Sequence, residues 1–254
     1  MKMFDLSGKV AIITGGNGGI GFGMSKGLSQ AGAHVVINGR NREKAEAAVA
    51  EIDAAGGSAS VAICDIRDPQ ACRDMVASTV GGHGRVDVLV NNSAINFPKS
   101  PQDFTLQEWH DVIDTNLTAP FVLCQAVYPH FLKQGGGKII NIGSIASFQS
   151  SPVGVAYSPS KGGILQLTKA LAVAWAGDNI QINAILPGWI DTPLSERARS
   201  NFPDLEAAVI ARTPAGRWGK TDDFAGAAVY LASSASNFVN GAHLVIDGAY
   251  SSKA

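Results

Sequence analysis

The sequence lacks an excess of charge of either sign. Its 254 residues include 20 Lys and Arg and 21 Asp and Glu, which gives a formal net charge of −1. Binding to nucleic acid or to an acidic membrane surface through overall charge needs a basic excess, so this balance favours neither partner. No apolar run approaches the ~20 residues that cross a bilayer, and residues 1–6 contain no apolar signal core. We therefore expect a cytoplasmic protein that binds neither nucleic acid nor membrane.

Cysteine and clustered metal ligands are also scarce. The three cysteines, Cys64, Cys72 and Cys124, are odd in number and form no Cys-x-x-Cys pair, which is typical of reduced thiols. The five histidines are scattered, and none stands in a His-Glu-x-x-His or comparable spacing. The sequence therefore predicts neither a disulfide framework nor a catalytic metal.

Apolar side chains and glycine are present in quantity. Hydrophobic residues make up 46% of the chain, enough for a large core, and no linker or charge run divides it. We expect one domain over residues 1–254. Strands are predicted at residues 9–14, 34–38, 60–64, 86–91, 138–142, 180–186 and 244–246. Helices are predicted at residues 20–31, 42–54, 69–80, 155–175 and 222–232, and within 106–131, where Pro120 and Pro129 perturb the pattern.

This alternation predicts the fold class. Continuously apolar strands separated by helices are typical of parallel pairing with both faces covered. The expected α/β fold is a doubly wound, parallel, seven-stranded Rossmann-type sheet with helices on both faces. Ligands of such sheets bind beyond the carboxyl ends of the strands. Asn91, Ser144 and Pro187 each follow or end a predicted strand, so three distant segments should meet at one edge.

Tyr157 and Lys161 stand at positions i and i+4 of the predicted helix 155–175. This spacing places both side chains on one helix face, one turn apart. A nearby ammonium favours the phenolate, so Lys161 is expected to lower the pKa of Tyr157 from its usual value near ~10. The pair suits proton exchange with an alcohol or carbonyl oxygen.

A glycine-rich turn follows the first predicted strand and opens the first helix. Glycines let the backbone approach a pyrophosphate, and a helix N-terminus offers free N–H groups to it. The strand–loop–helix context predicts a nucleotide site. Two motif registers fit: G-x-G-x-x-G on Gly16, Gly18 and Gly21, and T-G-x-x-x-G-x-G on Thr14, Gly15, Gly19 and Gly21.

The end of the second strand bears on cofactor choice. An acidic residue there would accept the ribose hydroxyls of NAD, but Gly39 occupies the position and Arg40 follows. A guanidinium binds a 2′-phosphate, so NADP(H) is favoured over NAD(H). Alternatively, Arg40 stacks on the adenine or points into solvent. Asp65 either accepts from the adenine amino group or caps the following turn.

Taken together, these motifs resemble the short-chain dehydrogenase/reductase family, over essentially the whole chain. The resemblance rests on Thr14–Gly21, Asn91–Ala94, Asn116, Ser144, Tyr157, Lys161 and Pro187–Gly188. It implies that Tyr157 is the general acid/base, that Lys161 supports it and bonds the nicotinamide ribose, and that Ser144 orients the substrate oxygen. It also implies that Asn116 holds a water in a proton relay.

The resemblance also implies a cofactor site drawn from the turns that follow the strands. Its members are Gly15, Asn17, Gly19, Ile20, Gly21, Arg40, Asp65, Ile66, Asn92, Ser93, Ala94, Tyr157, Lys161, Pro187, Gly188, Ile190 and Thr192. One departure from the family pattern is Asn-Asn-Ser-Ala at residues 91–94, where the family commonly has Asn-Asn-Ala-Gly. Ser93 and Ala94 are small, and they are expected to be tolerated unless Ala94 needs a left-handed backbone.

Four segments narrow the resemblance to the gluconate 5-dehydrogenase branch: residues 3–10, 38–40, 113–118 and 211–219. This branch implies a sugar-acid or polyol substrate with NADP(H). Residues 189–218 are expected to form a substrate lid, whose arginines either meet a substrate carboxylate or are solvated or salt-bridged on the surface. These arginines are Arg197, Arg199, Arg212 and Arg217.

Two other functions fit the same motifs. One is a 3-oxoacyl-thioester (acyl-carrier-protein) reductase, and the other is a nucleotide-sensing protein without catalysis. The family resemblance further implies a homotetramer, with contacts through the helices near residues 117–131 and 155–175 and through the C-terminal strand.

Overall fold

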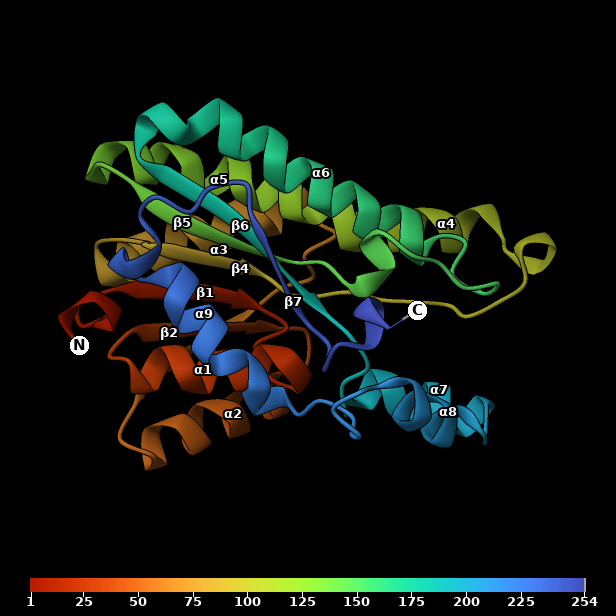
Figure 1. The fold of residues 1–254 in the computed structure, drawn as a ribbon. Helices are drawn as coiled ribbons and strands as arrows, with labels where there is room; N and C mark the ends of the chain where they lie inside the picture. The colour runs from red at the N-terminus through yellow and green to blue at the C-terminus, as the bar shows by residue number, and fades with distance from the viewer. Residues whose placement is uncertain (254) are drawn as a thin grey trace.

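Seven parallel strands form one sheet in the order β3-β2-β1-β4-β5-β6-β7, as seen in the computed structural model, which describes residues 1–253 (Figure 1). The strands are β1 Val10–Thr14, β2 His34–Gly39, β3 Ser58–Ile63, β4 Val88–Asn91, β5 Gly137–Ile142, β6 Ile180–Pro187 and β7 His243–Ile246. The predicted seven-stranded parallel sheet is confirmed. The strand order reverses between β1 and β4, which is where doubly wound sheets bind their ligands.

Helices cover both faces of this sheet (Figure 1). The main ones are α1 Gly19–Gln30, α2 Arg42–Ala54, α3 Pro69–His83, α5 Ala119–Gln134, α6 Tyr157–Trp175 and α9 Ala225–Ala232. Alternate strand residues serve the two faces: Ala11 and Ile13 pack in the core with α1, α2 and α9, whereas Val10 and Ile12 pack with α3, α5 and α6. This period of two explains why the strands are apolar throughout.

Three further helices lie toward the carboxyl ends of the strands: α4 Leu106–Ile113, α7 Pro193–Asn201 and α8 Leu205–Arg212 (Figure 1). The helix predicted within 106–131 is divided by a π-helical turn, Asp114–Thr118, between α4 and α5. Pro120 lies in the first turn of α5, directly after the π-helical turn, and Pro129 lies inside α5.

The predicted strand at residues 86–91 starts at Val88 in the structure, although the main chain of Asp87 already hydrogen-bonds Val10 and Lys138. The buried Asp87 carboxylate accepts the N–H of Val10 at 3.0 Å and pairs with Arg85 and Lys9. No helix within residues 1–253 has the length and apolar character needed to cross a membrane.

Candidate active site

The turns after β1 and β4 are joined through Thr14, the last residue of β1. Its hydroxyl accepts the N–H groups of Asn92 at 2.9 Å and Ser93 at 3.0 Å. The Asn92 amide donates back to the Thr14 carbonyl at 2.9 Å. These bonds fix the predicted residues Asn92 and Ser93 beside the glycine turn. Ala94 is not among the described non-glycine residues with positive φ, so its backbone is not left-handed and alanine is tolerated there.

The glycine turn has the T-G-x-x-x-G-x-G register. Gly15 and Gly19 adopt positive φ of 63° and 54°, whereas Gly18 is extended and Gly16 is not left-handed. A Cβ at Gly21 would lie 2.3 Å from the Gly15 carbonyl oxygen, so only glycine fits there. Gly18 caps α1 without a side-chain bond, which leaves the first N–H groups of the helix free for an anion such as a pyrophosphate.

The segment after β6 reaches the same turn. A Cβ at Gly19 would lie 3.5 Å from the Thr192 methyl group, so the two predicted cofactor residues are neighbours. Thr192 caps α7, while Ile190 is buried and pairs with Gly219 in an isolated bridge. Pro187 ends β6, and Gly188 packs against Asp247.

The ends of β2 and β3 form the other side of the turn. The Asn17 amide lies against Gly39, 2.5 Å from where a Cβ would be. The Arg40 side chain is 69% exposed, and its guanidinium lies 3.8 Å from Asp65. Asp65 accepts hydrogen bonds from the side chain and N–H of Arg67, which hold its pKa below the usual value. Asp65 thus caps its own turn, the second of its two predicted roles, and Ile66 beside it is buried.

Lys161 lies one turn after Tyr157, which begins α6. Its ammonium donates to the Ile142 carbonyl at 2.8 Å and lies 5.6 Å from the centre of the Tyr157 ring. The residue is only 2% exposed, and burial lowers its pKa to about 8. The ammonium therefore titrates near physiological pH.

The predicted direction of the Tyr157 pKa is wrong for the protein alone. Burial raises it, and the opposing influence is a side-chain hydrogen bond with Ser144, not the charge of Lys161. The reason is that the phenol is desolvated and the ammonium is directed at Ile142. Ser144 follows β5 and caps a short 3-10 turn by accepting the Ala146 N–H at 3.1 Å.

Asn116 lies in the π-helical turn and connects two segments of the site. Its Oδ1 accepts the Ile95 N–H at 2.9 Å, and its Nδ2 donates to the Ile95 carbonyl and to Ser160 Oγ, each at 3.0 Å. Ser160 in turn donates to the Tyr157 carbonyl at 2.7 Å. The π-helical turn thus holds the loop after β4 against the start of α6. Such turns are frequent at functional sites.

Three positioning residues were missing from the predicted site. Thr14 and Ser160 act as described above, and Ser147 donates to the Lys161 carbonyl at 2.7 Å. The sequence held signals for each. Thr14 begins the glycine motif, Ser147 stands at capping-box spacing from Ser144, and Ser160 lies between Tyr157 and Lys161 in the chain.

The lid arginines are held by protein partners. Arg199 pairs with Asp191 and lies 4.8 Å from the ring centre of Trp218, which packs edge-to-face on Trp189 at 5.6 Å. Arg217 pairs with Asp223, and Arg212 lies 4.6 Å from the ring centre of Tyr250. The Arg197 side chain lies outside the described part of the chain. Arg199 and Arg217 are therefore salt-bridged to protein carboxylates, whereas Arg212 contacts an aromatic ring.

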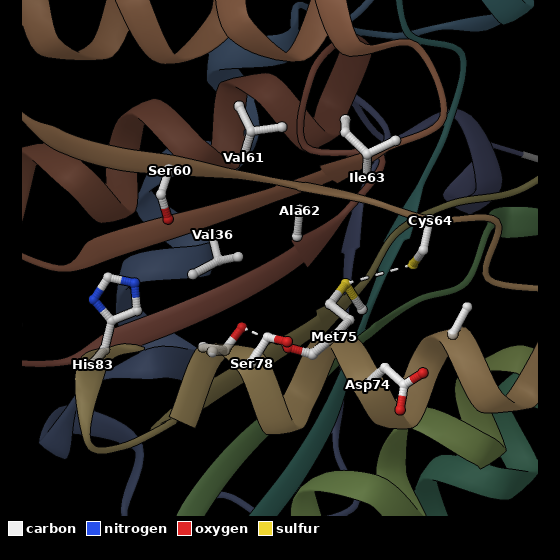
Figure 2. A pocket seen from close by; sticks show the side chains of 12 residues that line it. Val36, Ser60, Val61, Ala62, Ile63, Cys64, Asp74, Met75, Ser78 and His83 are labelled. Atoms are coloured by element: carbon white, nitrogen blue, oxygen red, sulfur yellow. Dashed lines mark hydrogen bonds between the residues drawn. The ribbon is translucent and has the colours of Figure 1, made fainter. Parts of the chain in front are cut away.

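A separate cavity of about 410 Å³ lies between β3 and α3. Figure 2 shows Cys64 and Met75 toward one end of it and His83 toward the other. None of the predicted site residues within 1–253 lines this cavity, so it is distinct from the candidate site.

The chain is similar to known proteins over most of its length. A family model described as "Enoyl-(Acyl carrier protein) reductase" matches residues 15–251. Gluconate 5-dehydrogenase of Gluconobacter oxydans (strain 621H) is 41% identical over 248 residues, covering 97% of this chain and 96% of that protein. 2-Dehydro-3-deoxy-D-gluconate 5-dehydrogenase of Dickeya dadantii (strain 3937) is 39% identical over 251 residues, 98% of each.

A solved structure extends the likeness to three dimensions. Gluconate 5-dehydrogenase from Burkholderia cenocepacia J2315, in complex with NADP and tartrate, superposes with a TM-score of 0.94 at 38% identity, covering 100% of this chain and 99% of that one. Similarity of this extent in both sequence and fold leaves one assignment: the chain belongs to the short-chain dehydrogenase/reductase family of NAD(P)-dependent oxidoreductases, which interconvert hydroxyl and carbonyl groups.

Proposed function

We propose that this protein interconverts a secondary alcohol and a ketone on a sugar acid or polyol and favours NADP(H). The observation that supports the chemistry is the meeting of Ser144, which follows β5, with Tyr157 and Lys161 at the start of α6. Support for the substrate comes from the relatives, whose names place the reaction at carbon 5 of gluconate or of its dehydro-deoxy derivative. Arg40 supports NADP(H), because it is exposed directly after Gly39, which occupies the position of the acidic residue that would select NAD.

Each residue of the site has its own role in the reaction. When bound, the nicotinamide supplies or accepts the hydride at the carbinol carbon. Tyr157 takes the hydroxyl proton during oxidation and returns it to the carbonyl oxygen during reduction. Ser144 orients that oxygen, and the Lys161 ammonium stabilises the phenolate in this desolvated site. The Asn116 amide has both N–H donors in use, so a relay water would be held by Oδ1 or by the main-chain carbonyl.

The cofactor would be held along the carboxyl edge of the sheet. This placement is supported by the free N–H groups of α1 and by the small residues Gly15, Gly19 and Gly21 that line the turn. The adenosine end would meet Asn17, Arg40, Asp65 and Ile66. The nicotinamide end would meet the predicted residues of the turn after β4, of α6 and of the 187–192 segment. Residues 189–218 would cover the substrate.

We also propose a cytoplasmic homotetramer. Cys64, Cys72 and Cys124 are free thiols, in keeping with a reducing compartment. Leu117, Phe121 and Leu167 line an apolar groove between α5 and α6, and Phe121 is 41% exposed in the single chain. Val245 on β7 is also exposed. These surfaces are the ones expected to contact other copies, because large apolar patches mark association sites.

The test is a substrate panel followed at 340 nm with both NAD(H) and NADP(H). Gluconate and 5-ketogluconate are expected to turn over faster than an acetoacetyl thioester. Faster reduction of the thioester would favour the 3-oxoacyl-thioester reductase alternative, which shares only the acyl carrier protein with the description of the family model. Tyr157→Phe is expected to bind NADPH but to lose turnover by roughly 10³-fold or more, because the proton donor is gone. Equal activity in that variant would discard the catalytic assignment.

A further inference from the structure

The ammonium of Lys44 lies against the glycine turn. A Cβ at Gly18 would be 2.8 Å from Lys44 Nζ and 3.1 Å from Cε. Gly18 has φ of −179°, an extended conformation that any residue adopts, so the backbone does not require glycine there. The absent side chain instead leaves the room that the ammonium fills.

Lys44 reaches this position from the first turn of α2. Asn41 caps the helix by accepting the Lys44 N–H at 2.9 Å, which sets the start of α2 immediately after β2. The end of β2 touches the turn through Gly39 and Asn17. The glycine turn, Arg40 and Lys44 therefore form one corner, on the β2 side of α1.

The basic side chains Arg40, Arg42 and Lys44 of this corner differ in whether a carboxylate lies close to them. Arg42 pairs with Glu46 at 3.3 Å, and Arg40 faces Asp65 at 3.8 Å. Lys44 is in none of the ion pairs found within residues 1–253. Its charge is therefore available to an anionic ligand, although the nearby carboxylates of Glu43, Glu46 and Asp65 reduce the local potential.

We infer that Lys44 is a second cation for the 2′-phosphate of NADP(H) and, together with Arg40, discriminates against NAD(H). This inference rests on the proposed preference for NADP(H). A phosphomonoester carries about −1.5 to −2 charges at neutral pH, more than one guanidinium that is shared with Asp65 neutralises. The N–H groups of α1 would bind the pyrophosphate, whereas the adenosine ribose would lie at the end of β2, on the side of the turn where Lys44 lies.

The test is a fluorescence titration of NADPH and NADH into the whole protein and into three variants. Lys44→Met is expected to weaken NADPH binding by about tenfold or more, because a charge-assisted bond is lost, and to change NADH binding by less than about twofold. Arg42→Met is the matched control. It removes an exposed cation from the same helical turn, and it should change both affinities by less than about twofold. Lys44→Arg should recover part of the NADPH affinity.

The outcomes separate this inference from the proposed function. The affinities of the unaltered protein for NADPH and NADH test the proposed cofactor preference alone, and we expect NADPH to bind more tightly. If that preference exists and Lys44→Met leaves it unchanged, the preference depends on Arg40 and the inference is overturned. An equal loss of NADPH and NADH would place the ammonium on the pyrophosphate, which also overturns it. An equal loss in Arg42→Met and Lys44→Met would show a general charge effect and would overturn it too.

Discussion

Lys161 donates its ammonium hydrogen bond to Ile142, the last residue of β5, at 2.8 Å. This carbonyl is the one hydrogen-bond acceptor that the ammonium has within residues 1–253, and it carries no full charge to offset burial. The lowered pKa of about 8 follows from this arrangement. The charge that would assist Tyr157 is therefore lost within an accessible pH range.

Ketone reduction is expected to fall as pH rises through about 8. Below that value Lys161 is charged, and above it the folded protein loses the proton. Tyr157, with its raised pKa, stays protonated across this range and remains a proton donor, so the fall reports the lysine. The measurement is kcat/KM for the ketone with NADPH between pH 6 and 10. A rate that keeps rising above pH 8 would contradict the assignment.

The same burial predicts a gain in stability when Lys161 is replaced. The unfolded chain holds the lysine proton up to its ordinary pKa of 10.5, whereas the folded chain releases it at about 8. The free energy of unfolding therefore rises with pH between these values, and at pH 7 the buried charge lowers it by about 3 kcal/mol. Lys161→Met should raise the melting temperature at pH 7, with a smaller effect near pH 10, and should abolish turnover.

Lys138 on β5 provides the matched control. It is also buried, its pKa is also lowered to about 8 by burial, and it bonds Asn237 at 2.9 Å and Ser236 at 3.3 Å. Lys138→Met should raise the free energy of unfolding by roughly 1–3 kcal/mol, reduced by the contribution of the hydrogen bonds that are lost. The variant should retain turnover. If Lys138→Met also abolished activity, the loss in Lys161→Met could not be assigned to the site.

The sequence was sufficient for the features that follow from local pattern. The strands are continuous apolar runs, and the spacing of Tyr157 and Lys161 sets their shared helix face. Features that depend on the three-dimensional surroundings of a residue could not be predicted from the sequence. The glycine register needs the φ values of Gly15 and Gly19, and the direction of the Tyr157 pKa needs its burial.

Long-range contacts were the other limit of sequence-based prediction. Asn116 was found by resemblance, but its bond to Ser160 spans 44 positions of sequence. Lys44 lies in an ordinary exposed helical pattern, and only the folded chain shows its ammonium against Gly18. Side chains that act across the sheet edge carry no local signal of their partner.

Gly21→Ala tests the packing of the glycine turn. The added Cβ would lie 2.3 Å from the Gly15 carbonyl oxygen and 2.5 Å from Asn92 Nδ2, so the turn must shift. We expect the free energy of unfolding to fall by about 2 kcal/mol and dinucleotide binding to weaken by at least about tenfold. Urea unfolding and NADPH titration measure the two effects.

Gly81→Ala in α3 is the control for this substitution. A Cβ at Gly81 meets nothing within 4 Å, and the residue is helical, so alanine should raise the free energy of unfolding by about 0.5 kcal/mol. It should leave cofactor binding unchanged. Normal binding in Gly21→Ala would show that the turn tolerates a shift and does not need the close contact.

Phe121→Glu tests the proposed tetramer. Phe121 lines the apolar groove between α5 and α6, and a carboxylate placed there would have to lose its water when a second copy covers the groove. Sedimentation velocity is expected to show a tetramer for the unaltered protein and a dimer or monomer for the variant. Leu106→Glu is the control, because Leu106 at the start of α4 is 71% exposed and lies outside the proposed contact surfaces. A monomeric unaltered protein would refute the tetramer, and dissociation in both variants would show that the groove is not the contact surface responsible.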